Sequence, residues 1–357
     1  MKKLGFWGRF VLVSAVAVAL SGCFNNKQDT QKKEAEKVKV SQEKKQFSGT
    51  VNFYTSLPKT IALEIADKYH QRYPEVTVNV YRSGASKIMA KLGAEIEAGK
   101  VMADVVWLAD PGNTIFLKNK GVLLKYTPEN AEKVAFKDKD GYYFAGRFIA
   151  PVIAFNTGIV KNPPKAFKVL SEKEYRNTLP SPWNTAKGWC AIPNPLYSGS
   201  ALAFTYGMYK LYGWDYFKNL KNNGVVVLKS NGSVKNGIIQ GENPVGVTLD
   251  YMVRQQKAKG MNIDYLYPED GTVLIPSPVA VLKTTKNPEV SKDFENFLLS
   301  KEVQTLLADN YIIPARSDVS SDKVPSIDSI KKINVDWDKV SENLEKIRNR
   351  FSQIMLK

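Results

Sequence analysis

The first third of the chain alternates between two hydrophobic periods. Short, mainly apolar runs of the kind that form buried strands are each followed by a segment in which apolar residues recur every three or four positions. In the first such segment, Ile61, Ile65 and Tyr69 fall on one helical face, and Pro74 ends the pattern. Three repeats of strand and helix predict a parallel sheet covered by helices. The predicted strands are 50–54, 76–81 and 103–108.

A second α/β unit is predicted in the middle of the chain. Its strands come at 191–193, 225–228 and 245–249, and a helix that carries Phe204 and Met208 follows the first of them.

Two apolar segments that contain proline, 148–155 and 274–281, lie between the two units. The chain therefore leaves one lobe, builds another and returns, and such paired crossings form a hinge beside a ligand-binding cleft. Two unrelated domains in series are the alternative. We predict an α/β fold in which lobe 1 comprises 48–148 plus 273–320 and lobe 2 comprises 149–272.

The last segment, 321–357, is predicted to end in a helix. Its apolar pattern lasts under three heptads, so a helix packed on the body of a monomer is favoured over a coiled-coil seam. The residues at helical spacing are Trp337, Val340, Leu344, Ile347, Phe351 and Ile354.

The N-terminus has the order of an export signal. Basic residues precede an apolar run, Phe10 to Leu20, which at 11 residues is too short to span a bilayer. Small residues then precede Cys23, and this arrangement resembles the bacterial lipobox, in which cleavage before the cysteine is followed by its acylation. We predict a signal peptide at 1–22 and lipidation of Cys23. An ordinary secretory signal with a chance cysteine is the alternative.

The segment that follows, 23–47, is charged and nearly free of large apolar residues, so we predict a flexible tether. These features place the protein on a lipid anchor at the outer side of the cytoplasmic membrane, or in the periplasm. A lipidated Cys23 leaves Cys190 without a disulfide partner.

The formal charge of +16 raises the question of nucleic-acid binding. The lysines are dispersed, however, and an exported protein rarely meets nucleic acid. We therefore interpret the charge as a solvated basic surface near an anionic membrane, with a mild preference for anionic ligands.

Four turns that follow a predicted strand and open a predicted helix carry small hydroxyl residues, glycine or aspartate. Such turns lie beyond the carboxyl ends of strands, where α/β sheets bind ligands, and helix N-termini there suit a phosphate, phosphonate or carboxylate. Serines that only cap their own helices are the alternative, but none has Glu or Gln three positions later. The turns are Thr55-Ser56, Ser83-Gly84-Ala85-Ser86, Ala109-Asp110-Pro111 and Tyr197-Ser198-Gly199-Ser200.

Two carboxylates accompany these turns. Asp110 opens a predicted helix, and Asp250 follows the predicted strand 245–249. Beside anion-binding turns they indicate a ligand with both signs of charge, or one with hydroxyl groups. The alternatives are a helix cap for Asp110 and a surface loop for Asp250, while Arg82 either pairs with the anion or points to solvent.

Catalytic chemistry finds little support. His70 is the only histidine, and we expect it on the surface of a helix, so no serine has a histidine to act as its general base. No Cys/His cluster has metal-ligand spacing. No phosphate loop of the nucleotide-hydrolase type occurs. We expect a binding protein without a cofactor, not an enzyme.

The chain resembles the substrate-binding lipoproteins of ABC importers, in the branch that takes ferric iron, phosphonates and phosphosugars. The resemblance implies a two-lobed, periplasmic-binding-protein-like fold of type II, which closes on its ligand and docks on a membrane permease driven by a cytoplasmic ATPase. It spans about 48–320, and its motifs are Ser83-Gly84-Ala85-Ser86, 103–107, 192–201, 245–251 and 286–289.

Ferric binders of this branch hold iron with two adjacent tyrosines at the segment that matches 249–251. This chain has Leu249-Asp250-Tyr251 there, with a single tyrosine, so the resemblance favours phosphonates and sugar phosphates over iron. Iron requires that Tyr54, Tyr197 and Tyr251 converge.

We therefore expect the binding lipoprotein of an ABC importer for a small anionic solute, a phosphonate or phosphorylated compound. Ferric iron is the first alternative, and a surface adhesin or antigen that keeps the fold without transport is the second. The predicted ligand-binding residues are Tyr54, Thr55, Ser56, Ser83, Gly84, Ser86, Asp110, Tyr197, Ser198, Gly199, Ser200, Asp250 and Tyr251.

Overall fold

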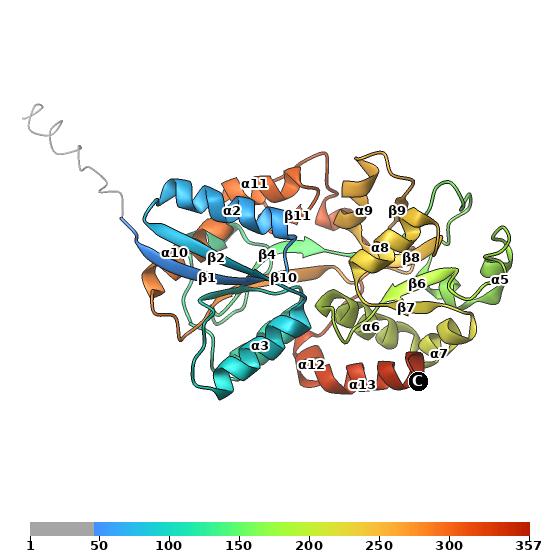
Figure 1. The fold of residues 1–357 in the computed structure, drawn as a ribbon, viewed down its shortest axis with the longest axis horizontal. Helices are drawn as coiled ribbons and strands as arrows, with labels where there is room; N and C mark the ends of the chain where they lie inside the picture. Colours follow the sequence, from blue (N-terminus) through green and yellow to red (C-terminus); the bar gives the residue numbers. More distant parts are fainter. Residues whose placement is uncertain (1–45) are drawn as a thin grey trace, which may run out of the picture. The chain divides into compact units, whose positions relative to one another are not determined.

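Two β-sheets form the framework of the computed structural model, which describes residues 46–357 (Figure 1). The predicted signal peptide 1–22, the predicted lipidation site Cys23 and nearly all of the predicted tether 23–47 lie outside the described residues.

The first sheet is mixed rather than purely parallel. Strands β1, β2 and β3 run parallel, as the alternating pattern predicts. The returning strand β10 enters antiparallel between β3 and β4, because it comes back from the second sheet in the opposite direction. The order across the sheet is β11 (Ile313–Pro314), β4 (Phe144–Ile149), β10 (Ile275–Val281), β3 (Val105–Trp107), β1 (Gly49–Thr55) and β2 (Val76–Arg82).

The second sheet is also mixed. Its strand β6 runs parallel to β7 and β8, whereas β5 runs antiparallel to β8 and β9. The order across the sheet is β7 (Val226–Leu228), β6 (Cys190–Pro193), β8 (Val245–Leu249), β5 (Pro151–Phe155) and β9 (Asp264–Leu266).

Helices cover both faces of each sheet (Figure 1). Those of the first sheet are α2 (Lys59–Arg72), α3 (Ala85–Glu97), α4 (Pro111–Asn119), α10 (Pro288–Leu298) and α11 (Lys301–Asp309). Those of the second are α6 (Gly199–Tyr212), α8 (Asn231–Gln240) and α9 (Asp250–Lys257), while α5 (Lys173–Asn177) and α7 (Asp215–Asn222) pack on the 3₁₀ turn that begins at Phe167. Short 3₁₀ turns are η1 (Glu129–Lys133), η2 (Phe167–Ser171) and η3 (Ile327–Ser329).

The chain crosses between the sheets within the two proline-containing segments. Ala150 alone separates β4 from β5 on the outward crossing, and the return crossing lies between β9 and β10. We use lobe 1 and lobe 2 for the parts built on the first and the second sheet. Residues 47–357 form one compact unit, so the lobe boundaries stay a prediction.

Two C-terminal helices, α12 (Trp337–Glu342) and α13 (Leu344–Met355), contact both lobes. Helix α12 packs on α4 of lobe 1, and α13 packs on α6 and α7 of lobe 2. Gly112 of α4 makes room for this arrangement, because a Cβ atom there would lie 2.7 Å from Cγ1 of Val340.

A buried tryptophan organises lobe 1 beside strand β4. Trp107 is fully buried, and its Nε1 donates to the carbonyl oxygen of Ser277 at 3.1 Å. A Cβ atom at Gly146 would collide with the Trp107 ring. Glycine is therefore needed for this close packing, which fixes the backbone next to Arg147.

Candidate functional site

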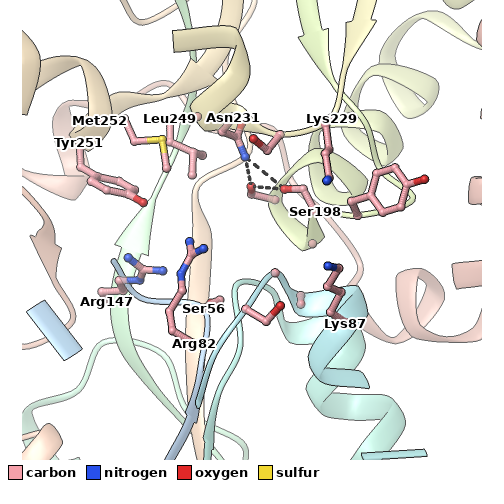
Figure 2. Close-up of a pocket in the computed structure, with 18 residues that line it drawn as sticks. Ser56, Arg82, Lys87, Arg147, Ser198, Lys229, Asn231, Leu249, Tyr251 and Met252 are labelled. Carbon is pink, nitrogen blue, oxygen red and sulfur yellow. Dashed lines mark hydrogen bonds between the residues drawn. The ribbon is translucent and has the colours of Figure 1, made fainter. Parts of the chain in front are cut away.

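A cavity of about 370 Å³ opens where segments of both lobes approach each other (Figure 2). Lobe 1 contributes the turns after β1 and β2, the start of α3 and one residue of β4, and lobe 2 contributes the starts of α6, α8 and α9. The volume is in the range of small-molecule sites.

Eight of the thirteen predicted ligand-binding residues line this cavity. Three of the four predicted turns meet there, together with the junction of β8 and α9, whereas the turn around Asp110 does not reach it. The eight residues are Ser56, Ser83, Gly84, Tyr197, Ser198, Gly199, Ser200 and Tyr251. That they bind a ligand stays a prediction.

Three of the other five residues belong to the packing of lobe 1. The Tyr54 hydroxyl donates to Glu95 Oε1 at 2.7 Å, away from the cavity lining. Thr55 is fully buried, and its Oγ1 accepts from the backbone N–H of Leu57 at 3.1 Å. The hydroxyl of Ser86 is buried without a hydrogen-bond partner in the described residues.

The two predicted carboxylates do not line the cavity either. Asp110 is the N-cap of α4, and its carboxylate accepts from the backbone N–H of Asn113 at 3.0 Å and from its side-chain amide at 2.8 Å. Asp250 is fully buried, and it bonds the Arg254 guanidinium and the Tyr267 hydroxyl, both at 2.9 Å. Both carboxylates are therefore engaged by groups of the fold outside the cavity lining.

Two arginines of lobe 1, Arg82 and Arg147, line one end of the cavity. Arg82 ends β2, and its Nε donates to the carbonyl oxygen of Leu57 at 3.0 Å. Arg147 of β4 is 1% exposed, its Nε lies 3.3 Å from Ser277 Oγ, and its Nη1 is buried without a partner in the described residues. Neither arginine forms an ion pair within the part of the chain that the structure describes.

Tyr251 of lobe 2 faces these arginines (Figure 2). The guanidinium carbon of Arg147 lies 5.5 Å from the centre of its ring. Burial raises the pKa of the Tyr251 hydroxyl, and the charges of Arg147 and Arg82 offset only part of that rise. The hydroxyl therefore remains protonated near neutral pH and is available as a hydrogen-bond donor.

The burial of Arg147 without a counter-ion is unfavourable. Burial lowers the pKa of this guanidinium, which means that its surroundings disfavour the charged form. A buried charge ordinarily has a partner. An anion in the cavity would supply one, because a guanidinium presents a planar set of donors that matches carboxylate and phosphate oxygens.

Hydroxyl and amide groups of lobe 2 line the middle of the cavity. Ser198 and Ser200 Oγ atoms are 3.0 Å apart, and Asn231 Nδ2 donates to both, at 3.1 and 2.9 Å. Ser198 also caps α6, and Ser230 caps α8, so both serines have structural bonds as well. These bonds hold the polar groups in fixed positions.

Two lysines lie at the other end of the cavity. Lys87 comes from the first turn of α3, and Lys229 from the segment between β7 and α8. No aspartate or glutamate is among the cavity-lining residues, all of which belong to the described part of the chain. The cavity wall therefore carries positive charge without an acidic counterpart.

The cavity wall also contains residues that are not among those predicted from the sequence: Arg147, Lys87, Lys229 and Asn231, together with Arg82, whose role the sequence leaves open. Arg147 had a local signal, since it is a lone charge between apolar neighbours in the proline-containing crossing region. Lys229 and Asn231 follow a predicted strand at the start of α8, whose first residue is Asn231, and this is the same position that drew attention to the serine turns.

Metal binding has limited support in the described residues. No group of three or more histidine, cysteine, aspartate or glutamate side chains within residues 46–357 is placed to hold a metal ion. Of the three tyrosines required for iron, Tyr197 and Tyr251 line the cavity and Tyr54 does not. Among the described helices, none combines the length and the apolar character needed to cross a membrane.

The sequence model for bacterial extracellular solute-binding proteins matches residues 102–343. The chain is also 23% identical, over 295 residues, to a putative 2-aminoethylphosphonate-binding periplasmic protein of Salmonella typhimurium, covering 78% of this chain and 83% of that protein.

Solved structures of periplasmic binding proteins share the fold. The fructose-6-phosphate-bound protein AfuA of Actinobacillus pleuropneumoniae superposes with a TM-score of 0.76 at 22% identity, covering 87% of this chain and 99% of that one. Iron-bound HitA of Pseudomonas aeruginosa gives a TM-score of 0.73 at 21% identity, with coverage of 85% and 99%. The predicted two-lobed α/β fold is thereby confirmed, and at these identities the likeness concerns the fold alone.

Proposed function

Since the chain belongs to the bacterial extracellular solute-binding proteins, we propose that it captures a small solute with a phosphonate or phosphate group for an ABC importer. Membership of this family confirms the prediction of a binding protein rather than an enzyme.

The observation that carries the ligand class is the buried Arg147. Its Nη1 has no partner in the described residues, it lies beside Arg82, and it faces the Tyr251 hydroxyl. A tetrahedral oxyanion would accept from both guanidinium groups and from the hydroxyl at once, with Ser56 and Ser83 within the same cavity. The start of α3 adds the partial positive charge of a helix N-terminus, and its N-cap Gly84 provides no side-chain oxygen.

The relatives support the same class. One is described as binding 2-aminoethylphosphonate and another holds fructose 6-phosphate. The residues of the cavity come from both lobes, so a bound anion would bridge them and stabilise the closed form, as in other hinged binding proteins. We propose that the closed form docks on a membrane permease driven by a cytoplasmic ATPase, and that the monomeric protein is held at the membrane by lipidated Cys23.

The test is calorimetric titration and thermal melting of the purified protein with phosphonates and sugar phosphates that differ in their other groups. We expect at least one to raise the melting temperature, since a ligand at 100 times its Kd adds about 2.7 kcal/mol. Arg82→Gln should weaken that ligand roughly tenfold to a hundredfold, because a hydrogen bond to a charged group contributes about 1.5–3 kcal/mol. The control Arg350→Gln removes an exposed charge of α13 that lies outside the cavity lining.

Ferric iron stays the alternative, because iron-bound HitA shares the fold and two tyrosines line the cavity. A visible absorption band on addition of a ferric salt, together with no response to any phosphonate or sugar phosphate, would replace our proposal with iron. A protein that responds to neither would favour the surface adhesin.

A further inference from the structure

The lysine end of the cavity is built from both lobes. Figure 2 shows the ammonium groups of Lys87 and Lys229 pointing toward one another across the cavity, on the side away from Arg147 and Tyr251. Lys87 belongs to α3 of lobe 1, and Lys229 precedes α8 of lobe 2. Any ligand that fills the cavity from the arginine end therefore extends toward two facing cations.

Neither lysine has a counter-ion. Within residues 46–357, Lys87 and Lys229 take part in no ion pair or side-chain hydrogen bond, and no acidic residue lines the cavity. Two like charges that face each other repel, and that repulsion grows when the lobes close and water leaves. Closure over an empty lysine end is thus disfavoured, whereas an anionic group between the two lysines would attract both lobes.

We propose that the ligand of this site is a solute with two acidic groups, one at each end. This inference rests on the proposed function: one group, the phosphonate or phosphate, binds at Arg82, Arg147 and Tyr251. The second acidic group lies between Lys87 and Lys229. The hydroxyl and amide groups of Ser198, Ser200 and Asn231 line the space between the two ends and suit a short polar linker.

The same geometry disfavours an aminophosphonate. An ammonium group needs carboxylate or carbonyl partners, and the two nearby carboxylates are engaged elsewhere. Asp110 caps α4, and Asp250 is paired with Arg254. An ammonium at the lysine end would instead meet two further cations, so this chain differs in chemistry from what the name of its Salmonella typhimurium relative describes.

Three phosphonates with chains of matched length test the inference by calorimetry at fixed ionic strength. They are 3-phosphonopropionate, which ends in a carboxylate, propylphosphonate, which ends in a methyl group, and 2-aminoethylphosphonate, which ends in an ammonium. We expect the carboxylate to bind at least about tenfold more tightly than the methyl compound, and the ammonium to bind most weakly. Homologues one and two carbons longer cover the unknown best length.

The double substitution Lys87→Gln with Lys229→Gln assigns the preference to its residues. The ratio of affinities between the carboxylate and the methyl compound should fall to about one, because both facing charges are gone. The matched control is Lys100→Gln with Lys259→Gln, which removes one exposed lysine from each lobe outside the cavity and should keep the ratio. All four lysines are exposed, and melting curves without ligand verify that each variant is folded.

The outcomes separate this inference from the proposed function. If the three compounds bind equally, or the ammonium compound binds best, the inference of a second acidic group is wrong while the phosphonate site stands. A double variant that keeps the carboxylate preference also overturns the role of the lysines. If no phosphonate of any chain length and no sugar phosphate binds, the proposed function is wrong, and the inference of a second acidic group is wrong as well.

Discussion

Two buried arginines of this protein stand in opposite situations. Arg254 of α9 is 7% exposed, and each of its guanidinium nitrogens donates to a partner: Asp250, the hydroxyls of Tyr265 and Tyr267, and the carbonyl oxygen of Tyr311. Arg147 of β4 is 1% exposed, bonds Ser277 through Nε, and leaves Nη1 without a partner in the described residues.

The pKa values of the two guanidinium groups shift in opposite directions, because their partners differ. Burial alone would lower the pKa of Arg254, but the Asp250 carboxylate beside it raises that pKa above its ordinary value. Burial lowers the pKa of Arg147, and the Tyr251 hydroxyl and the more distant Asp250 carboxylate offset only part of that fall. Arg254 thus has its counter-charge within the fold, whereas Arg147 is suited to a charge that arrives from outside.

Breaking the buried ion pair between Asp250 and Arg254 should have the largest effect on the free energy of unfolding. Asp250→Asn leaves Arg254 buried with a neutral neighbour, and loss of one partner from a buried ion pair destabilises by about 3–5 kcal/mol. Urea unfolding of the variant without ligand measures this loss. A loss below about 1 kcal/mol would contradict the structural role that we assign to Asp250.

Replacing Arg147, the arginine without a counter-ion, should have the opposite effect: it should preserve stability and weaken ligand binding. Arg147→Met keeps much of the side-chain volume and removes an uncompensated charge, so the free energy of unfolding without ligand should stay level or rise by about 1 kcal/mol. Affinity for a phosphonate should fall roughly tenfold to a hundredfold. A variant that unfolds easily but still binds at parental affinity would place Arg147 among the structural residues.

Glu295 is the acidic counterpart of Arg147, because it is an ionisable group that is buried without an ion pair in the described residues. Glu295 of α10 is 1% exposed, and burial raises its pKa from 4.5 to about 8. The raised pKa means that the stability contribution of the neutral form is complete below pH 4.5 and is lost as the pH rises through about 8. Between pH 5 and pH 8 this group should lower the free energy of unfolding of the parent protein by on the order of 3–4 kcal/mol, since one pKa unit corresponds to about 1.4 kcal/mol.

The variant Glu295→Gln should flatten that dependence. Its free energy of unfolding, measured in urea at pH 5, 6.5 and 8, should approach or exceed that of the parent protein at the highest pH. Equal slopes for the two proteins would show that Glu295 titrates as it does in the unfolded chain.

The smallest effect belongs to a surface ion pair between Lys257, on the same helix as Arg254, and Asp264 of β9. Lys257 Nζ lies 2.7 Å from Asp264 Oδ2 at the surface of lobe 2. Lys257→Gln should change stability by less than about 1 kcal/mol, because solvent screens exposed ion pairs. A loss as large as that of Asp250→Asn would mean that burial does not separate the two pairs.

Much of the framework could be predicted from hydrophobic period alone. The strands at 50–54, 76–81 and 245–249 match β1, β2 and β8 closely, because each is a short apolar run next to a turn. The direction of β10 could not be predicted, since it depends on how the chain returns after building the second sheet.

The site was predictable only in part, because a turn's position says little about where its side chains point. Asp250 follows a strand, as a binding residue would, yet Arg254 one helical turn later takes its carboxylate. Asp110 precedes Pro111 and Asn113, a sequence equally typical of a helix cap. Arg147 needed the three-dimensional structure, since only there is its lack of a counter-ion visible.

The C-terminal helices give the two lobes a third attachment. Segments at Ala150 and between β9 and β10 already join them, and the contacts of α12 with α4 and of α13 with α6 and α7 add another. Extra tethering leaves fewer separated arrangements for the unliganded protein to sample. The protein then loses less conformational entropy when it binds a solute. We therefore expect the C-terminal helices to favour capture of a solute, although none of their residues lines the cavity.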